Sequence, residues 1–275
     1  MTTIGFITGS GFYRLAAANG RRLSVETPFG GVEIDTATLA GHRFLGLARH
    51  GDVHTRLSNQ VRHRANLWAL REAGAEAVVA STAVGILDAA LPLGTPLVFD
   101  DLFFPANRLP GGEPATFFTE PGAPGRGHWI PGSPFSPFLR RLLVEAAPRC
   151  GLRAVDGGCY GHVDGPRFNT RAEVAWLRAA GVAAVSQTCG PEAVLAGELE
   201  LPYALVGYGV NLAPGPGVEE TPPQELAALL GRHREVVGRL FEALLESLPA
   251  GVRPPLDTGV LYRIEAPPEG PAAGR

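Results

Sequence analysis

One stretch of the chain, residues 46–87, constrains the fold more than any other. It contains two short apolar runs, and each run stops at residues that can donate hydrogen bonds, RHG at 49–51 and STA at 81–83. Between the two runs, apolar residues recur at helical spacing from Leu57 to Trp68. A strand, a helix and a second strand form the βαβ unit of a parallel sheet, whose strands end at the same edge. Ligands of open α/β sheets bind at that edge, so the stretch predicts an anion site there.

The composition limits which side chains can serve such a site. Apolar residues make up 45% of the 275 residues, which is enough for a large buried core. The chain contains no lysine, and every basic residue is an arginine. An anion site in this protein must therefore use arginine, histidine or backbone N–H groups.

Charge and cysteine content indicate the compartment and exclude some partners. The formal net charge of −3 gives no basic surface for nucleic acid or for an anionic membrane. No apolar run approaches the length of a membrane span, and the N-terminus lacks the features of a signal peptide. Three cysteines without CxxC spacing are typical of a reducing compartment. We expect a cytoplasmic protein that binds neither nucleic acid nor membranes.

Local patterns predict strands and helices along a single domain. Apolar runs or alternation predict strands at 4–7, 32–39, 43–47, 77–80, 96–104, 154–163, 182–185 and 203–210. Helical spacing or start signals predict helices at 57–70, 138–147, 192–199 and 226–244, with capping boxes at 170–173 and 221–224. No linker or repeat divides the chain, so we expect one α/β domain over residues 1–248. The Pro- and Gly-rich segment 249–275 is expected to be an extended or disordered tail.

A glycine-rich turn follows the first predicted strand and places Ser10 between Gly9 and Gly11. Two glycines let backbone N–H groups approach an anion, and the serine hydroxyl adds a donor. Arg14 stands where a dinucleotide-binding fingerprint has its third glycine, so that motif is not matched. A plain tight turn is the alternative interpretation.

Six motifs along the chain together resemble those of one enzyme family. They are GSG at 9–11, RHG at 49–51, RANLWAL at 64–70, STAVG at 81–85, GPRF at 165–168 and PEAVLAGEL at 191–199. In this order, over about residues 4–245, they are similar to the methylthioadenosine phosphorylase branch of the trimeric purine nucleoside phosphorylases. The resemblance implies a mixed β-sheet flanked by helices, assembled as a homotrimer or a dimer of trimers. It also implies phosphorolysis, in which inorganic phosphate is a co-substrate and cleaves a purine nucleoside with no further cofactor.

The resemblance also implies a phosphate site. Its residues would be Ser10, Arg49, His50, Thr82, Ala83 (through its backbone) and Thr188. A dianion needs several converging donors, and the planar fork of arginine suits its oxygens. Metal is not expected, because no carboxylate or cysteine cluster completes a site around His50 and His54. Cys189 has no activating partner at a suitable spacing and is expected to be a small packed residue.

The nucleoside site implied by the resemblance is drawn from several segments. Its residues would be Phe168, Asn169, Gln187, Asn211, Ala213, His54 and His128. Phe168 would pack on the base, and Gln187 takes the place of a methionine beside the ribose. His54 would lie near the 5′ end of the nucleoside, whereas His128 would reach the site of a neighbouring subunit.

The leaving base is expected to be a 6-oxopurine. Adenine-directed members of the family carry Asp-x-Asp where this chain has Asn211 and Ala213, a change that resembles the 6-oxopurine members. An asparagine amide can donate to a 6-oxo group and accept from a protonated N7, so Asn211 joins Arg49 and His50 as an expected catalytic residue. Asn169 stands where 6-oxopurine enzymes usually have a glutamate, so specificity for the base can be relaxed or unusual. Inosine, guanosine and 5′-methylthioinosine all remain candidate substrates.

Three alternatives to this prediction remain. The first is a phosphorylase of adenosine or methylthioadenosine, because a rotated Asn211 amide can also serve adenine. The second is a nucleoside hydrolase, which would use water and would not need the RHG motif at 49–51. The third is a non-catalytic nucleoside-binding paralogue, which would explain Asn169 and Gln187 but not the phosphate donors.

Overall fold

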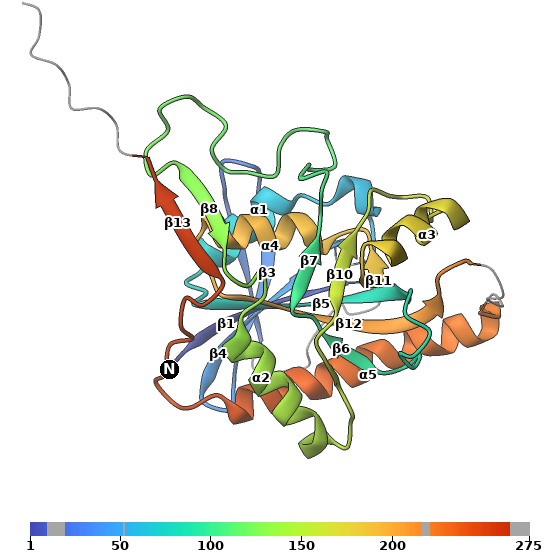
Figure 1. The fold of residues 1–275 in the computed structure, drawn as a ribbon. Coiled ribbons are helices and arrows are strands. Elements are labelled where there is room, and N and C mark those ends of the chain that lie inside the picture. The colour runs from blue at the N-terminus through green and yellow to red at the C-terminus, as the bar shows by residue number, and fades with distance from the viewer. Residues whose placement is uncertain (10–19, 52, 216–220, 265–275) are drawn as a thin grey trace, which may run out of the picture.

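The computed structural model describes residues 1–9, 20–51, 53–215 and 221–264, and Figure 1 shows how they are arranged. Within these residues, a mixed β-sheet is flanked by helices, as predicted. Its strands are β1 (Thr3–Thr8), β2 (Arg21–Val25), β3 (Val32–Leu39), β4 (His42–Ala48), β5 (Ala77–Ile86), β6 (Pro96–Val98), β7 (Asp101–Phe103), β9 (Val155–Asp156), β10 (Cys159–His162), β11 (Val182–Ser186) and β12 (Tyr203–Leu212). A second sheet pairs β8 (Gly127–Pro131) with β13 (Gly259–Arg263).

One half of the main sheet is organised around β1. This strand is buried along its whole length and is parallel to both of its neighbours, β4 and β5. The strands predicted at 32–39 and 43–47 are confirmed as β3 and β4, which form an antiparallel hairpin. Its turn is made by Ala40 and Gly41 with φ of +50° and +76°, the backbone sign that a tight two-residue hairpin turn requires.

The other half of the sheet is reached through β5, which changes its neighbour part-way along. Residues 77–80 of β5 pair with β1, whereas Gly85 and Ile86 pair antiparallel with β11. The sheet then continues through β10 to β7, while β12 pairs with β5 and β6. Between its two partners, around residues 81–83, one edge of β5 faces neither strand. The backbone groups on that edge are the first elements of the site described below.

Helices cover both faces of the sheet (Figure 1). The two clusters of helices are α1 (His63–Glu72) with α4 (Cys189–Glu198) on one face and α2 (Pro137–Ala146) with α5 (Pro223–Ser247) on the other. Successive side chains of β1 point to opposite faces of the sheet, so the strand contributes to the apolar core on each face. Phe6 packs with Phe241 of α5, while Ile7 belongs to the cluster that contains Leu70 of α1. Among the described residues, no helix combines the length and apolar character needed to cross a membrane.

Two capping boxes were predicted, and one of them forms. Thr170 caps α3 (Arg171–Ala179) by accepting from the Glu173 N–H at 3.3 Å, and the Glu173 carboxylate accepts from the Thr170 N–H at 2.8 Å. The box predicted at 221–224 is wrong, since α5 has Pro222 at its N-cap and no side-chain cap. Thr221 instead accepts from the Leu212 N–H at 3.3 Å and closes the end of β12.

Several element boundaries differ from the sequence prediction. The strand predicted at 77–80 continues to Ile86, because β11 and β12 supply partners that a local pattern does not reveal. The strand predicted at 154–163 is divided by Gly157 and Gly158, whose φ values of +97° and +112° interrupt it. The helix predicted from 192 begins at Cys189, because Pro191 falls in the first turn, where a missing N–H costs nothing.

The Pro- and Gly-rich segment after residue 248 contains an ordered strand. Its residues 259–263 form β13, which pairs antiparallel with β8, so Tyr262 lies opposite His128. Trp129 of β8 packs directly over Gly197 of α4, where an added Cβ would lie 2.2 Å from the indole. The small sheet is therefore anchored to the helix layer through this glycine.

We predict that Gly197→Ala lowers the free energy of unfolding by about 1–3 kcal/mol, because the new methyl group must displace the Trp129 ring. Urea-induced unfolding measures the change. Gly231→Ala is the matched control, since this helical glycine has no atom within 4 Å of an added Cβ and should gain about 0.5–1 kcal/mol. Equal stability of Gly197→Ala and the wild type would contradict this packing.

Candidate active site at the carboxyl ends of the strands

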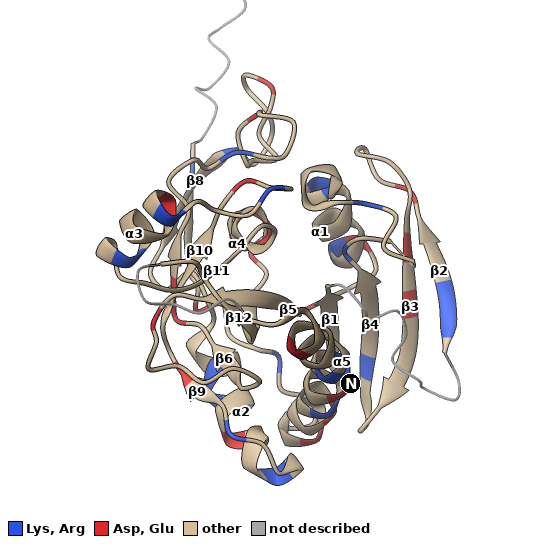
Figure 2. Ribbon diagram, turned by 90° about the vertical axis from the view of Figure 1, so that its right-hand side faces the viewer, with Lys and Arg blue, Asp and Glu red and all other residues tan. Residues whose placement is uncertain are grey.

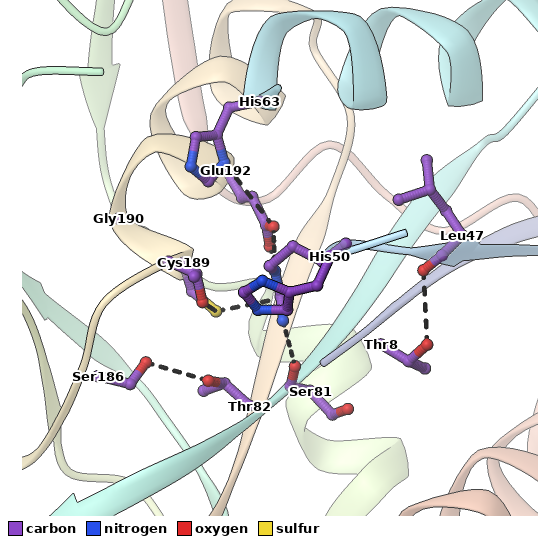
Figure 3. Close-up of polar contacts among 12 residues, drawn as sticks. Thr8, Leu47, His50, His63, Ser81, Thr82, Ser186, Cys189, Gly190 and Glu192 are labelled. Carbon is purple, nitrogen blue, oxygen red and sulfur yellow. Dashed lines mark hydrogen bonds and ion pairs between the residues drawn. The ribbon is translucent and has the colours of Figure 1, made fainter. Parts of the chain in front are cut away.

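A set of polar side chains gathers where β1, β4 and β11 end and β5 changes its neighbour (Figure 3). Thr8 ends β1, Arg49 and His50 follow β4, and Thr82 lies on β5. The start of α4, at Thr188, completes the set. The parallel strands predicted from residues 46–87 therefore deliver their donors to one edge, as expected.

Arg49 is the most deeply buried member, with 1% of its surface exposed. Its Nε and Nη2 atoms donate to the two carboxylate oxygens of Glu192, at 2.5 and 2.9 Å. Nη1 donates to the backbone carbonyl of Ser81 at 2.8 Å, and Nη2 also contacts the Cys189 sulfur at 3.4 Å. Burial alone would lower the pKa of Arg49, but Cys189 and Glu192 raise it above its ordinary value. The guanidinium is therefore a fixed positive charge.

The orientation of Arg49 differs from the one expected from the sequence. We expected its planar fork to face phosphate, but Glu192 occupies the edge formed by Nε and Nη2. The Nη1 edge faces the strand ends, close to Gly9, where an added Cβ would lie 3.3 Å away. Any anion at this edge can therefore meet Arg49 only through Nη1.

Glu192 itself was missed as a site residue. It belongs to the quoted motif at 191–199 and is fully buried in the first turn of α4, where it also accepts from the Tyr203 hydroxyl at 2.8 Å. The available signal was an acidic residue within an otherwise apolar helix start, because a buried carboxylate needs a charged partner.

His50 and His54 lie together, with ring centroids 4.5 Å apart in a stacked arrangement. The Nδ1 atom of His50 lies 2.9 Å from the backbone carbonyl of Arg56. A carbonyl only accepts, so Nδ1 carries a proton and Nε2 of the neutral ring offers a lone pair. Burial and the charge of Arg49 lower the pKa of His50 to about 4. His50 is thus neutral at physiological pH.

Thr82 and Thr188 line the same edge from two other segments. Thr82 Oγ1 lies 3.0 Å from the hydroxyl of Ser186, which lies 2.7 Å from the Tyr160 hydroxyl. Thr188 Oγ1 lies 3.5 Å from the Cys189 sulfur. Burial raises the pKa of Cys189 to about 11, which keeps it a thiol and agrees with a packed residue rather than a nucleophile.

Ala83 lies one residue beyond Thr82 on the unpaired edge of β5. Successive residues of a strand direct their backbone groups to alternate sides, so the Ala83 N–H faces the same side as the Ser81 carbonyl. Arg49 Nη1 lies on that side as well, since it binds this carbonyl. The backbone donor expected at Ala83 is therefore directed toward the edge where Arg49 lies.

Gln187 connects two loops at the rim of this edge. Its Oε1 accepts from the Ser58 hydroxyl at 2.8 Å, and its Nε2 donates to the Arg167 carbonyl at 2.7 Å. A cavity of about 390 Å³ opens beside these residues, lined among others by Asn59, Arg108 and His162. The amide of Gln187 thus holds the rim together instead of standing free for a sugar.

Asn211 and Ala213, expected at the base, lie near the end of β12. The register of β12 against β5 shifts between Gly209 and Asn211, so Val210 bulges and Asn211 pairs with Gly85. An added Cβ on Gly85 would lie 3.5 Å from the Asn211 amide, so the amide rests against bare backbone. Ala213 is buried in an apolar cluster with Val185.

Phe168 and Asn169 lie in the loop that precedes α3. Phe168 is 85% exposed, so the packing surface expected for a base faces solvent. The Asn169 amide nitrogen lies 3.5 Å from Glu173, which is also held by both terminal nitrogens of Arg167 at 2.6 and 2.8 Å. Hydrogen bonds from Arg167 lower the pKa of Glu173 to about 2.

Two expected residues lie apart from this group or outside the structure. His128 is exposed on β8 of the second sheet, and among the described residues no hydrogen bond or ring contact joins it to the strand ends. Ser10 lies outside the described residues. Within the described part of the chain, no cluster of three or more His, Cys, Asp or Glu side chains is arranged to hold a metal.

Comparison with known proteins places this geometry in a family. Residues 3–246 match the family described as the Phosphorylase superfamily. The chain belongs to this superfamily. It is 33% identical over 254 residues to the 6-oxopurine nucleoside phosphorylase of Pyrococcus furiosus, covering 90% of this chain and 94% of that protein.

Other members of the superfamily have different names. The S-methyl-5′-thioadenosine phosphorylase of Mycobacterium tuberculosis is 36% identical over 250 residues, covering 88% of each chain. A solved methylthioadenosine phosphorylase from an antarctic soil metagenomic library superposes with a TM-score of 0.79 at 26% identity, covering 88% of this chain and 85% of that one. Membership therefore confirms the predicted family and fold, while the named substrates differ among relatives.

The histidines of this superfamily member should make its stability depend on pH. Burial lowers the pKa of His50 and His233 to about 4 and of His63 and His162 to about 3. In the unfolded chain, the pKa of a histidine is about 6.5. Below that pH, the unfolded chain therefore binds more protons than the folded chain. The free energy of unfolding should therefore fall from pH 6 to pH 5, by about 1.4 kcal/mol per pH unit for each such histidine.

Chemical denaturation at several pH values tests this prediction in the wild type and in His233→Phe. The variant keeps an aromatic ring against Tyr208, on which His233 stacks with centroids 5.2 Å apart. The free energy of unfolding of the variant should depend less steeply on pH, by about 1.4 kcal/mol per pH unit, because the variant lacks one titrating histidine. Identical slopes for the two proteins would contradict the assignment.

Proposed function

We propose that this chain is a pentosyltransferase that uses inorganic phosphate to cleave purine nucleosides, with a preference for 6-oxopurines. Phosphate would attack the anomeric carbon and the bond from that carbon to the purine would break. The base would leave with a proton taken up at N7 from solvent, balanced by the proton that the attacking hydrogen phosphate gives up. The products are the free purine and ribose 1-phosphate, or its 5-methylthio form. The single observation that carries the proposal is the buried Arg49, whose Nη1 faces the unpaired edge of β5.

The donors at this edge support phosphate as the co-substrate. Arg49 Nη1 and the Ala83 N–H share one side of β5, and Thr82 and Thr188 contribute hydroxyls beside it. Neutral His50 adds a lone pair on Nε2, which can accept from a P–OH group. A protonated oxygen held by His50 would leave the remaining phosphate oxygens to Arg49 and to the sugar.

The identity of the leaving base rests on Asn211. Its amide, which lies beside the backbone of Gly85, can donate to a 6-oxo group and accept from protonated N7. Ala213 supplies no carboxylate for an exocyclic amine. The 6-oxopurine nucleoside phosphorylase among the relatives supports this choice, whereas the methylthioadenosine phosphorylases support the alternative of an adenine nucleoside.

The wider setting follows from the same proposal. The enzyme would act in the cytoplasm in purine salvage, as a homotrimer or a dimer of trimers, without a cofactor beyond its phosphate co-substrate. It would bind neither nucleic acid nor membranes. The exposed position of His128 is consistent with a role at the site of a neighbouring subunit, and the exposed Phe168 leaves a surface for the base.

Inosine should be cleaved in the presence of phosphate and left intact in its absence. Arg49→Ala should raise the KM for phosphate by about tenfold or more, because a charge-assisted hydrogen bond to the anion is lost. Initial rates of hypoxanthine release over a range of phosphate concentrations measure both effects.

Arg43→Ala is the matched control, since Arg43 lies on β4, the strand that Arg49 follows, and binds the Ala73 carbonyl away from the site. It should leave the KM for phosphate unchanged. Equal turnover of inosine with and without phosphate would favour a hydrolase, and binding without turnover would favour a non-catalytic paralogue. Either result would overturn the proposed reaction.

Asn211→Asp should move the preference from inosine toward adenosine. A carboxylate accepts from an exocyclic amine but repels a 6-oxo group, so kcat/KM for inosine should fall by about tenfold or more while the KM for phosphate stays the same. A panel of inosine, guanosine, adenosine and their 5′-methylthio forms measures the change. If wild-type protein already prefers the adenine nucleosides, the assignment of the base is wrong.

A further inference from the structure

Glu192 is the one carboxylate among the described residues that touches the buried guanidinium of Arg49. Its two oxygens accept from Nε and Nη2 of Arg49, and one of them also accepts from the Tyr203 hydroxyl. The side chains of Glu192 and Arg49 are both without solvent exposure. No water competes for these bonds, so the carboxylate holds the guanidinium plane in one orientation.

The hydrogen bonds of Arg49 leave one N–H group for a ligand. A guanidinium carries five N–H groups. The described partners take Nε–H, both hydrogens of Nη2 and one of Nη1. The remaining hydrogen of Nη1 faces the region between Gly9 and the edge of β5. Only the orientation set by Glu192 directs this hydrogen there.

A contribution to the stability of the fold does not by itself explain why the chain has this buried ion pair. Removing two charges from water costs more than their attraction returns in many buried pairs, and apolar replacements are often neutral or stabilising. The apolar core around α4 would accept such a replacement, since Leu195, Ala193 and Ala196 of the same helix are all buried. The pair is instead located at the ligand edge of the sheet, which points to a role in binding.

The start of α4 does not itself offer amides to an anion. The Cys189 N–H donates to the Tyr160 hydroxyl at 3.1 Å, the Gly190 N–H donates to His162 Nδ1 at 3.3 Å, and Pro191 has no N–H. The helix dipole nevertheless favours negative charge in the first turn, where Glu192 lies. The helix thus stabilises the Glu192 carboxylate, which in turn orients Arg49.

His63, the histidine near Glu192, does not compete with Arg49 as the positive charge that pairs with this carboxylate. His63 is fully buried, with Nδ1 3.9 Å from Glu192 Oε1, and neither of its ring nitrogens has a hydrogen-bond partner among the described residues. Burial and the charge of Arg49 keep its pKa near 3, so it is neutral. Among the described residues in contact with Glu192, Arg49 carries the positive charge.

We propose that Glu192 is the positioning residue of the phosphate site: it holds Nε and Nη2 of Arg49 so that Nη1 alone is presented to the phosphate co-substrate. This inference rests on the proposed function. Glu192 does not touch phosphate in this arrangement, and it acts through Arg49. Removing its negative charge should therefore weaken the use of phosphate and leave the binding of the nucleoside unchanged.

The test compares Glu192→Gln with the wild type in initial-rate measurements on the full chain. The glutamine NH₂ would face the N–H groups of Arg49, so the guanidinium loses a partner and turns away. The KM for phosphate should rise by about tenfold or more, while the KM for inosine and the kcat at saturating phosphate change by less than about threefold. Thermal unfolding of the same samples checks that both proteins are folded at the temperature of the assay.

Glu198→Gln is the matched control. Glu198 lies on the same helix, is half-buried and accepts from the Phe117 N–H at 2.6 Å, away from Arg49. It should leave both KM values unchanged. A double-mutant cycle then asks whether Glu192 acts through Arg49, because Glu192→Gln should have no further effect on the KM for phosphate once Arg49→Ala is present.

Three outcomes would overturn the inference. These are an unchanged or lower KM for phosphate in Glu192→Gln, an equal loss for phosphate and inosine, or an effect that persists in the Arg49→Ala background. If Glu192→Gln does not fold, Tyr203→Phe removes the hydroxyl that holds the carboxylate and should raise the KM for phosphate by about twofold to threefold, and an unchanged value would count against the proposal.

Failure of the proposed function would look different. In that case the wild type itself shows no phosphate-dependent cleavage of any purine nucleoside. Calorimetric titration with inorganic phosphate then tests Glu192 separately, since the wild type should bind phosphate at least about tenfold more tightly than Glu192→Gln. Equal affinities would overturn the positioning role whatever the reaction is.

Discussion

The ion pair between Arg49 and Glu192 is the interaction on which the rest of the site depends. It joins residues 143 positions apart, one at the end of β4 and the other in the first turn of α4. A buried charge without its partner is strongly destabilising, so the sheet and the helix layer must meet in this register. His50 directly follows Arg49, and Thr188 is the N-cap residue of the helix that carries Glu192, so both lie at this junction. Figure 3 shows His50 and Thr82 in the same group as Glu192.

Much of the fold could be predicted because its signals are local. Alternation and apolar runs predicted β3, β4 and β11 nearly to the residue, and the capping box at Thr170 fixed the start of α3. The length of β5 could not be predicted, because it depends on β11 and β12 arriving as partners after β1 has ended. Figure 2 shows how the strands on either side of β5 diverge into two groups.

The site was predictable only in part, because contacts between distant segments leave no local signal in the sequence. Strand ends and family motifs indicated Arg49, His50 and Thr82, because each follows a local pattern. The direction of the Arg49 fork could not be read from sequence, since it is set by Glu192 from a distant segment. Gln187 was expected beside a sugar, yet its amide is used by Ser58 and by the Arg167 carbonyl. In both cases, hydrogen bonds between segments decide what a side chain presents to a ligand.

The small sheet of β8 and β13 has a consequence for how the chain folds as it is made. Until residues 259–263 leave the ribosome, β8 lacks the strand that pairs with it among the described residues, and its backbone N–H and C=O groups form an open edge. Pairing across so long a separation forms slowly, since the loop between the strands must close first. The nascent chain therefore carries an open strand edge from the time that β8 emerges until β13 follows and covers it.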